Sequence, residues 1–317
     1  MLDAEDVSVS YTEREGRQQL HAVQDLDLQI RAGETVAVVG ESGSGKSSFV
    51  RAVLGLIPMR AGRVTFCGRE LAGPVQARAV EMRRDLQLVF QDPAGSLNPQ
   101  LRIEQVIAEP LAVHAADLDT KARRERVAAA LHRVGLDEGL LRRFPHQLSG
   151  GQAQRVAIAR ALIVNPRVLV CDEAVAALDG SVRRQILDLL QREQQVTGLG
   201  IVFISHDLAV VRSISHRVMV LYLGRLIELA NGAGIFGRPR HPYTRALLDA
   251  VPVPDPVSPG GKPSLGGEMP SIITPPTGCA FHPRCRHAQA RCRVERPRAR
   301  LVGDAHVACH RAEELEL

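Results

Sequence analysis

The sequence predicts an α/β fold with a mostly parallel sheet, and two observations carry this prediction. Four short apolar runs have the length and composition of strands that are buried on both faces: 35–39, 86–90, 168–171 and 201–204. Helix-forming stretches separate most of these runs, as the crossovers between parallel strands require. Because the chain has 317 residues, we expect one large domain with a smaller appended part.

The other elements follow in order along the chain. Apolar residues alternate with polar ones at 7–11 and at 26–30, which predicts two half-buried strands of a separate antiparallel layer. After the buried strand at 35–39, a glycine-rich loop leads into a predicted helix from about Lys46 to Leu56. Helix-forming residues and arginines then dominate from about 104 to 141, so we expect an inserted helical subdomain over about 92–165.

The composition changes after a predicted hairpin, 218–222 and 225–229, that closes the core. From Val251 the sequence reads VPVPDPVSPGGKP, and such closely spaced prolines favour an extended linker. The residues beyond it contain four of the six cysteines. We therefore expect three parts: a main domain at 1–250, a linker at 251–264 and a separate small unit at 265–317.

Composition excludes several classes of protein. No apolar run approaches the roughly 20 residues of a membrane-spanning helix, and the acidic N-terminus does not resemble a signal peptide, so we expect a cytoplasmic protein. The net charge of +5 is scattered among Asp and Glu, and aromatic residues make up only 3% of the chain, with no Trp. Both features argue against a nucleic-acid partner.

The strongest motif is a phosphate-binding loop, G-x-x-x-x-G-K-[ST], between a predicted strand and a predicted helix. Its backbone N–H groups would face phosphate oxygens, the Lys46 ammonium would reach the terminal phosphates, and the Ser47 hydroxyl would ligate Mg²⁺. The alternative is a chance glycine turn, but Lys46 is one of only three lysines in the chain. The residues expected to contact a nucleotide here are Gly40, Ser42, Gly43, Gly45, Lys46, Ser47 and Ser48.

Two adjacent carboxylates, Asp172 and Glu173, end the apolar run that starts at Val168. A buried strand commonly delivers such acids to its carboxyl edge beside a phosphate site. Asp172 would hold Mg²⁺ through water, and Glu173 would act as the general base for an attacking water. Two acids at a strand end can also be surface charges or a helix cap, and the phosphate loop makes that alternative weaker.

The segment 148–152, Leu-Ser-Gly-Gly-Gln, opens a predicted helix and is similar to the signature of ATP-binding-cassette (ABC) ATPases. The resemblance covers about residues 2–250 and implies an ABC-type ATPase core that uses ATP and Mg²⁺. Four further positions match the family's motifs in family order: the adenine-stacking aromatic (Tyr11), the Q-loop (Gln91), the D-loop (Asp179) and the switch histidine (His206). The resemblance makes Gln91 an Mg²⁺ ligand and His206 a sensor of the terminal phosphate, whereas a lone Tyr or His after a strand can also be structural.

Within the ABC family, two ATPase domains meet head to tail, and each signature closes over the ATP of the other. The resemblance therefore implies that four residues bind the partner's nucleotide: Ser149, Gly150, Gly151 and Gln152. A serine and two glycines at a helix N-terminus suit such an anion site. Ala176 and Gly180 depart from the pattern of close relatives beside Asp179, while Glu173 and His206 are both intact.

Four segments resemble the oligopeptide/dipeptide import branch of the family: 89–98, 241–248, 251–256 and 278–285. This resemblance implies an ATPase that energises peptide uptake from the cytoplasmic face of the inner membrane. Its implied partners are a second ABC ATPase, expected to be a paralogue, two membrane permease subunits and an extracytoplasmic solute-binding protein. Alternatives are an importer of nickel, metal chelates, glutathione or another small solute, and a cytosolic ABC ATPase without a transport role.

The cysteines of the tail, Cys279, Cys285, Cys292 and Cys309, lie in a part with little apolar content, so we expect something to cross-link it. Because disulfides are disfavoured in the cytoplasm, a metal is the better candidate, either zinc or an iron–sulfur cluster. The resemblance to peptide-import tails favours a [4Fe–4S] cluster with a structural role, bracing the tail against the partner ATPase. Ordinary buried thiols remain an alternative, and four histidines are possible zinc ligands: His282, His287, His306 and His310.

Overall fold

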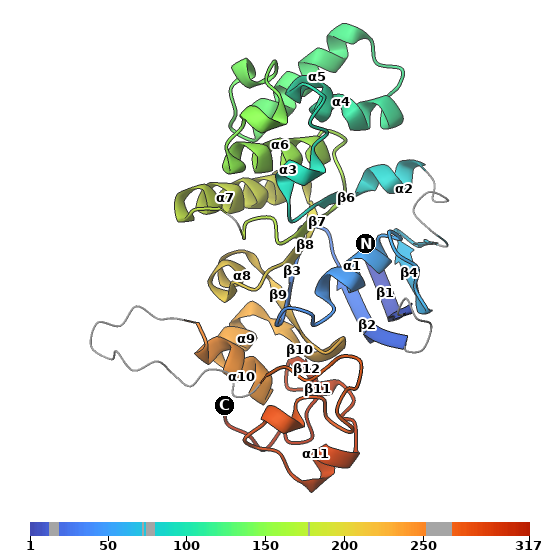
Figure 1. Cartoon of the computed structure of the whole chain (residues 1–317), viewed down its shortest axis with the longest axis vertical. Helices are drawn as coiled ribbons and strands as arrows, with labels where there is room; N and C mark the ends of the chain where they lie inside the picture. The colour runs from blue at the N-terminus through green and yellow to red at the C-terminus, as the bar shows by residue number, and fades with distance from the viewer. Residues whose placement is uncertain (13–18, 72, 74–79, 177, 252–267) are drawn as a thin grey trace, which may run out of the picture. The chain divides into compact units, whose positions relative to one another are not determined.

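The computed structural model describes residues 1–12, 19–71, 73, 80–176, 178–251 and 268–317 (Figure 1). The chain divides into two compact units. Unit 1 comprises Met1–Leu2, Ile30–Thr35 and Phe66–Ile204, and unit 2 comprises Asp3–Gln29, Val36–Thr65 and Ser205–Leu317. The linker expected at 251–264 lies, apart from Val251, outside the described residues, as does Ala177 of the expected D-loop.

Unit 1 contains three parallel strands, β6 (Leu86–Val89), β7 (Val168–Asp172) and β8 (Gly200–Ile204). In register, β7 places Val168 opposite Leu86 of β6 and opposite Gly200 of β8. Every residue of β7 and β8 is buried, as the continuous apolar runs predicted.

The helices of unit 1 fall mainly between β6 and β7, where the sequence predicted a helical insertion. They are α2 (Val80–Asp85), α3 (Pro93–Ser96), α4 (Ile103–His114), α5 (Thr120–Arg133), α6 (Gly150–Leu162) and α7 (Gly180–Thr197). Two short 3₁₀ turns, Glu138–Leu140 and Pro145–Gln147, precede α6, and the short strand β5 spans Arg69–Glu70. Asp119 caps α5, because its carboxylate accepts a hydrogen bond from Ala122 N at 2.7 Å.

Unit 2 holds two groups of strands. The first has the order β3-β9-β10-β12-β11: β3 (Thr35–Val39), β9 (Arg217–Tyr222), β10 (Arg225–Asn231), β12 (Ala305–Val307) and β11 (Arg300–Val302). Strands β3 and β9 are parallel, whereas β9–β10, β10–β12 and β12–β11 are antiparallel. The second has the order β2-β1-β4: β2 (Gln19–Ile30), β1 (Leu2–Thr12) and β4 (Ala61–Phe66).

Unit 2 also contains α1 (Lys46–Val53), α8 (Leu208–Ile214), α9 (Gly232–Gly237), α10 (Pro242–Asp249), the 3₁₀ turn η4 (His282–Arg284) and α11 (Ala290–Val294). Helix α1 ends earlier than the predicted Leu56. Gly55 adopts a φ of 73°, and its N–H donates to Ala52 O at 2.8 Å while Leu56 N donates to Arg51 O at 2.8 Å. This Schellman pattern closes the helix one turn early.

The C-terminal segment 268–317 differs from the separate unit that the sequence predicted. Its hairpin β11–β12 joins the sheet, because Val307 and His306 of β12 pair with Glu228 and Leu229 of β10. Phe281 of this segment also shares one apolar core with strands β9 and β10 and with helix α10. The segment is therefore part of unit 2 (red in Figure 1).

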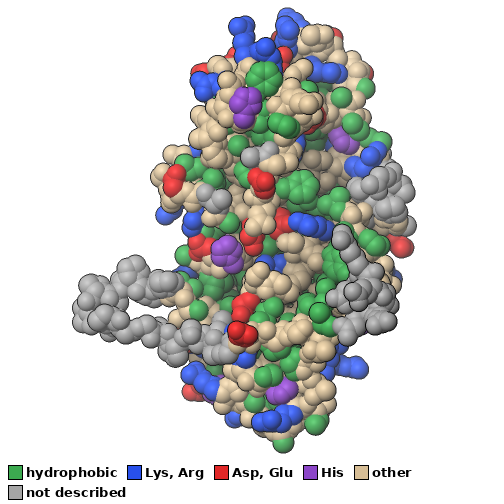
Figure 2. Space-filling model, in the orientation of Figure 1, with side chains coloured by type: hydrophobic (Ala, Val, Ile, Leu, Met, Phe, Trp, Pro, Cys, Tyr) green, Lys and Arg blue, Asp and Glu red, His purple; other side chains and the backbone are tan. Residues whose placement is uncertain are grey.

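Charged side chains are mixed over the surface. On the face in Figure 2, Lys and Arg side chains are interspersed with Asp and Glu, which agrees with the scattered charge of the sequence. Among the described residues, no helix combines the length and the apolar character that crossing a membrane requires.

Candidate functional site

The predicted phosphate loop lies in unit 2, between the end of β3 and the start of α1. Three of its glycines have positive φ angles: 151° at Gly40, 77° at Gly43 and 96° at Gly45. A Cβ atom at Gly40 or Gly45 would lie 2.3 Å from a backbone carbonyl oxygen, so only glycine fits these two positions. The motif thus forms a tight loop that enters the N-terminus of a helix, as a phosphate site requires.

Lys46, the first residue of α1, is buried, and its ammonium turns into the loop. Its Nζ donates to the carbonyl oxygens of Gly40 and Glu41, both at 2.9 Å. The loop therefore curls around a positive charge, while Ser42 and Gly43 at its tip are exposed. This arrangement places a cation beside the backbone that is expected to hold phosphate.

Tyr11 and His206 also belong to unit 2 and are both exposed. The Tyr11 hydroxyl donates to Ser48 Oγ at 3.1 Å, so the ring stands beside the helix that follows the phosphate loop. With 40% of its surface exposed, the ring is available for stacking rather than packed away. His206 lies in the turn before α8, where Asp207 caps the helix by accepting from Ala209 N at 3.0 Å.

The predicted catalytic acid pair lies at the carboxyl end of β7 in unit 1. Asp172 is 2% exposed, and Glu173 follows it with a φ of 50°, a left-handed conformation that few non-glycine residues adopt. Gln91, just beyond the parallel strand β6, donates through Nε2 to Glu173 Oε2 at 2.8 Å. The structure thus brings Gln91 and Glu173 into contact, and the unusual backbone of Glu173 is typical of functional sites.

The signature segment forms the N-terminus of α6. Ser149 Oγ accepts a hydrogen bond from Gln152 N at 3.3 Å, and the Gln152 side chain accepts from Ser149 N at 3.0 Å, so the pair is a capping box. Ser149 and Gly150 are exposed, and a Cβ atom at Gly150 would meet nothing within 4 Å. The helix end is therefore open to an anion from outside.

Asp179 caps α7 at the expected D-loop. Its Oδ1 accepts hydrogen bonds from Val182 N at 2.9 Å and Ser181 N at 3.1 Å. The bond from Val182, followed by that from the Ser181 hydroxyl, holds the pKa of this carboxyl below its usual range. Asp179 therefore has a local structural role at the start of α7.

The predicted nucleotide residues fall into two sets, one in each unit. The set in unit 2 is Tyr11, the loop Gly40–Ser48 and His206. The set in unit 1 is Gln91, Ser149–Gln152, Asp172, Glu173 and Asp179. In the set of unit 2, Tyr11 is hydrogen-bonded to Ser48, and in the set of unit 1, Gln91 is hydrogen-bonded to Glu173.

The four predicted cysteines of the tail are all free thiols that line one small cavity of about 20 Å³. His241, His282, His287 and His310 line it as well, whereas His306 does not. Burial raises the pKa of Cys279 and of Cys309 to about 11. These thiols would therefore lose their protons only beside a bound cation, which stabilises the thiolate form. Within the described part of the chain, no group of three or more potential ligands is arranged so that it could hold a metal ion.

One contact of the tail was missed at the sequence level. Arg284, between Cys279 and Cys285, donates through Nη1 to Glu41 of the phosphate loop, at 2.9 Å from Oε1 and 3.2 Å from Oε2. The small unit that the sequence predicted at 265–317 as separate therefore contacts the phosphate loop directly. Nothing in a single sequence pairs residues 243 positions apart, although a charged side chain inside a phosphate loop could have prompted a search for its partner.

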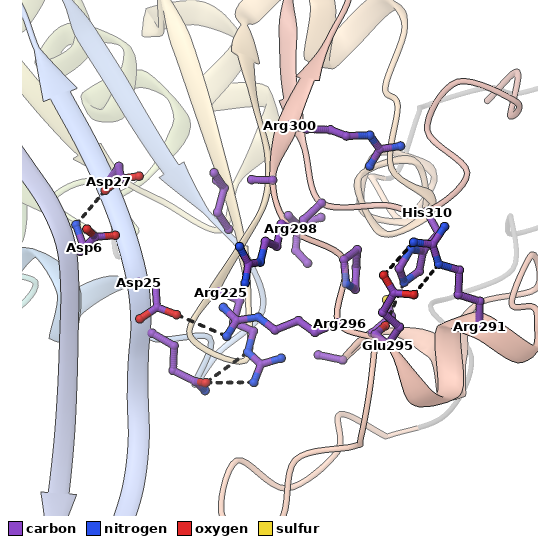
Figure 3. A pocket seen from close by; sticks show the side chains of 18 residues that line it. Asp6, Asp25, Asp27, Arg225, Arg291, Glu295, Arg296, Arg298, Arg300 and His310 are labelled. Carbon is purple, nitrogen blue, oxygen red and sulfur yellow. Dashed lines mark hydrogen bonds and ion pairs between the residues drawn. The ribbon is translucent and has the colours of Figure 1, made fainter.

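A cavity of about 980 Å³ in unit 2 lies between β1, β2, β10 and the segment 295–300 (Figure 3). Asp6, Asp25 and Asp27 line one side of it, and Arg296 bonds Asp25 Oδ2 at 3.3 Å. Five arginines, Arg225, Arg291, Arg296, Arg298 and Arg300, share the lining with these carboxylates. The cavity contains none of the predicted nucleotide residues.

Comparison with known proteins agrees with this geometry. Residues 23–176 match the family model for the ABC transporter, and residues 227–292 match that for the oligopeptide/dipeptide transporter, C-terminal region. Among solved structures, the dimeric ATP-binding cassette MJ0796 bound to ADP and Pi is 30% identical with a TM-score of 0.66, covering 73% of this chain and 98% of that chain. The cbiO1 protein from Clostridium perfringens is 31% identical with a TM-score of 0.64, covering 74% of this chain and 90% of that chain. The fold and its phosphate loop are those of an ATP-binding cassette.

Two relatives show to which family of ATP-binding cassettes the chain belongs. The oligopeptide transport ATP-binding protein OppF of Salmonella typhimurium is 45% identical over 306 residues, which cover 94% of this chain and 92% of the relative. The di/tripeptide transport ATP-binding protein DppF of Pseudomonas aeruginosa is 45% identical over 301 residues, with the same coverage of 94% and 92%. The chain belongs to the oligopeptide/dipeptide family of ABC transporter ATP-binding proteins.

Proposed function

We propose that this chain binds and hydrolyses ATP as the ATPase subunit of an ABC importer of peptides. The observation that carries the proposal is a phosphate loop of the required geometry in a chain that also pairs Gln91 with Glu173 at the end of β7. Its relatives are named for the transport of oligopeptides and of di- and tripeptides, which supports peptides over nickel, metal chelates or another small solute as the cargo.

The residues take the following roles. The backbone N–H groups of the loop and the Lys46 ammonium bind the phosphates, and the Tyr11 ring stacks on adenine. Ser47, Gln91 and Asp172 would hold Mg²⁺, which neutralises phosphate charge when bound. Glu173 orients and deprotonates the attacking water, and His206 reads the terminal phosphate.

The exposed start of α6 supports a dimer. Ser149–Gln152 offer an anion site at a helix N-terminus, although the chain has its own phosphate loop elsewhere. We infer that this site closes over the ATP of a second ABC ATPase, a paralogue, with Asp179 at the junction. A related cassette has been solved as a dimer. The pair would bind two permease subunits at the cytoplasmic face of the inner membrane and act with an extracytoplasmic solute-binding protein.

We further propose that residues 1–250 carry the ATPase function and that the cysteines of the tail hold a [4Fe–4S] cluster. Four free thiols line one cavity, and thiolates are the donors that such a cluster needs, although they are not arranged here to hold a metal ion. The cavity of about 20 Å³ has room for about one water molecule, so the side chains around it would have to move apart to admit four irons. Protein purified without oxygen should be brown, with broad absorbance at ~400 nm. A colourless protein with stoichiometric zinc would assign the site to zinc instead.

The ATPase proposal is tested with the purified chain and its paired ATPase, with and without detergent-solubilised permeases. We expect Mg²⁺-dependent phosphate release that rises when permeases and peptide-loaded binding protein are present. Glu173→Gln serves as the control that binds ATP without turnover. Turnover equal in wild type and this variant would show that the activity comes from a contaminant and would overturn the assignment.

A further inference from the structure

The turn between the first two cysteines of the tail reaches the phosphate loop. Arg284, the last residue of η4, has a side chain that is only 5% exposed in its ion pair with Glu41. Its Nη1 lies within hydrogen-bond distance of both carboxylate oxygens of Glu41 and donates at 3.3 Å to the Tyr222 hydroxyl. A guanidinium shared by three acceptors in a buried setting fixes the Glu41 side chain strongly.

Glu41 is held at its backbone by the same group of side chains. Its N–H donates to the Tyr243 hydroxyl at 3.1 Å. The rings of Tyr222 and Tyr243 lie 4.7 Å apart, and both pack on Phe281, at 5.5 and 5.2 Å between centroids. Because Phe281 sits between Cys279 and Arg284 in the chain, the cysteine segment and its aromatic neighbours hold Glu41 at two points.

Glu41 in turn contacts the residue that binds phosphate. Its carbonyl oxygen accepts a hydrogen bond from Lys46 Nζ at 2.9 Å. A carboxylate in this loop opposes a triphosphate electrostatically, and in a poorly solvated site such repulsion is large. Arg284 offsets this charge and holds the carboxylate in an ion pair, so the loop opposes an incoming anion less.

We propose that Arg284 is a positioning residue for the phosphate loop, and that the cysteine segment 279–292 sets the affinity for ATP through it. The inference deepens the proposed function and rests on it. The segment sets this affinity through its direct contact with the loop, whether or not a metal is bound to its cysteines.

Four variants test the charge argument by the Kd of a fluorescent ATP analogue and by KM and kcat for ATP. Losing a charge-assisted bond and exposing Glu41 should raise the Kd and KM in Arg284→Ala on the order of tenfold, with kcat changed far less. Arg284→Lys keeps the charge and should restore most of the affinity. In a Glu41→Gln background, Arg284→Ala should have little further effect, because the charge to be neutralised is gone.

Arg296→Ala is the control, since this arginine of the C-terminal segment 268–317 pairs with Asp25 and makes no described contact with the loop. Its Kd should equal that of the wild type. Equal thermal unfolding of Arg284→Ala and Arg296→Ala would show that the difference in Kd is not a loss of folding. A merely structural role would predict equal losses for Arg284→Ala and Arg284→Lys, and no rescue by Glu41→Gln.

Cys285→Ser tests whether the segment acts through Arg284. It should raise the Kd for nucleotide when Arg284 is present and leave the Kd unchanged in the Arg284→Ala background. The reason is that Cys285 affects the loop only through the position of Arg284. If the wild type binds the analogue and Arg284→Ala binds it equally well, the inference is wrong while the proposed function stands. If the wild type does not bind it, the proposed function itself fails.

Discussion

Phe281→Ala probes the attachment of the C-terminal segment to the core. Phe281 is 2% exposed and packs on the rings of Tyr222, Tyr243 and His241, the last at 5.9 Å between centroids. Truncating a fully buried phenyl group in such a setting costs about 3–5 kcal/mol, including about 0.5–1.5 kcal/mol for each aromatic pair that is lost. We expect the free energy needed to separate β12 from β10 to fall by this amount.

Native-state hydrogen exchange measures that opening. Amides of the β10–β12 pair, such as the backbone groups near Glu228 and Val307, should exchange roughly two to three and a half orders of magnitude faster in the variant. Val294→Ala, at a residue of the same segment that is 81% exposed, should shift exchange by less than about 0.5 kcal/mol. A loss below about 1 kcal/mol in Phe281→Ala would show that the aromatic cluster does not anchor the segment.

Three predictions concern the nucleotide residues. Glu173→Gln should lower phosphate release at least about 100-fold while the Kd for ATP stays unchanged, and a smaller loss would argue against a general base. Lys46→Ala should weaken equilibrium binding of ATP itself, because it removes the cation at the centre of the loop, so an unchanged Kd would contradict that role. Ser149→Arg on one chain of a mixed dimer should remove trapped nucleotide from the partner's loop, and loss from the mutant chain's own loop would contradict the head-to-tail arrangement.

Local patterns predicted much of the fold. The strand at 35–39 is β3 with the predicted bounds, and the hairpin around Gly224 is β9–β10. Such elements are readable because periodicity and glycine placement act within a few residues of the chain. Gly55 lies inside the helix predicted to about Leu56, and a single glycine is a weak signal because a helix interior tolerates one.

Long-range pairings could not be read in the same way. Strands β11 and β12 have three residues each, which is too short for an alternation of apolar and polar residues to be recognised. Their place beside β10 depends on the apolar core that they share with it. The Arg284–Glu41 pair is likewise set by tertiary packing, since neither residue has a neighbour in sequence that indicates the other. The prolines after Val251 predicted that the C-terminal segment is separate from the main domain, whereas the described part of this segment belongs to unit 2.

The resting contacts of the reactive groups indicate what nucleotide must change. Lys46 Nζ is bonded to two carbonyl oxygens of its own loop, and Glu173 accepts a hydrogen bond from Gln91. Since both groups already have partners, ATP has to exchange these bonds for its own rather than meet unsatisfied charges. Affinity then depends on how firmly the loop keeps its shape while Lys46 turns to phosphate. Arg284 and Tyr243 fix Glu41, whose carbonyl oxygen is one of the two acceptors that Lys46 must leave, so the C-terminal segment acts on the step where binding begins.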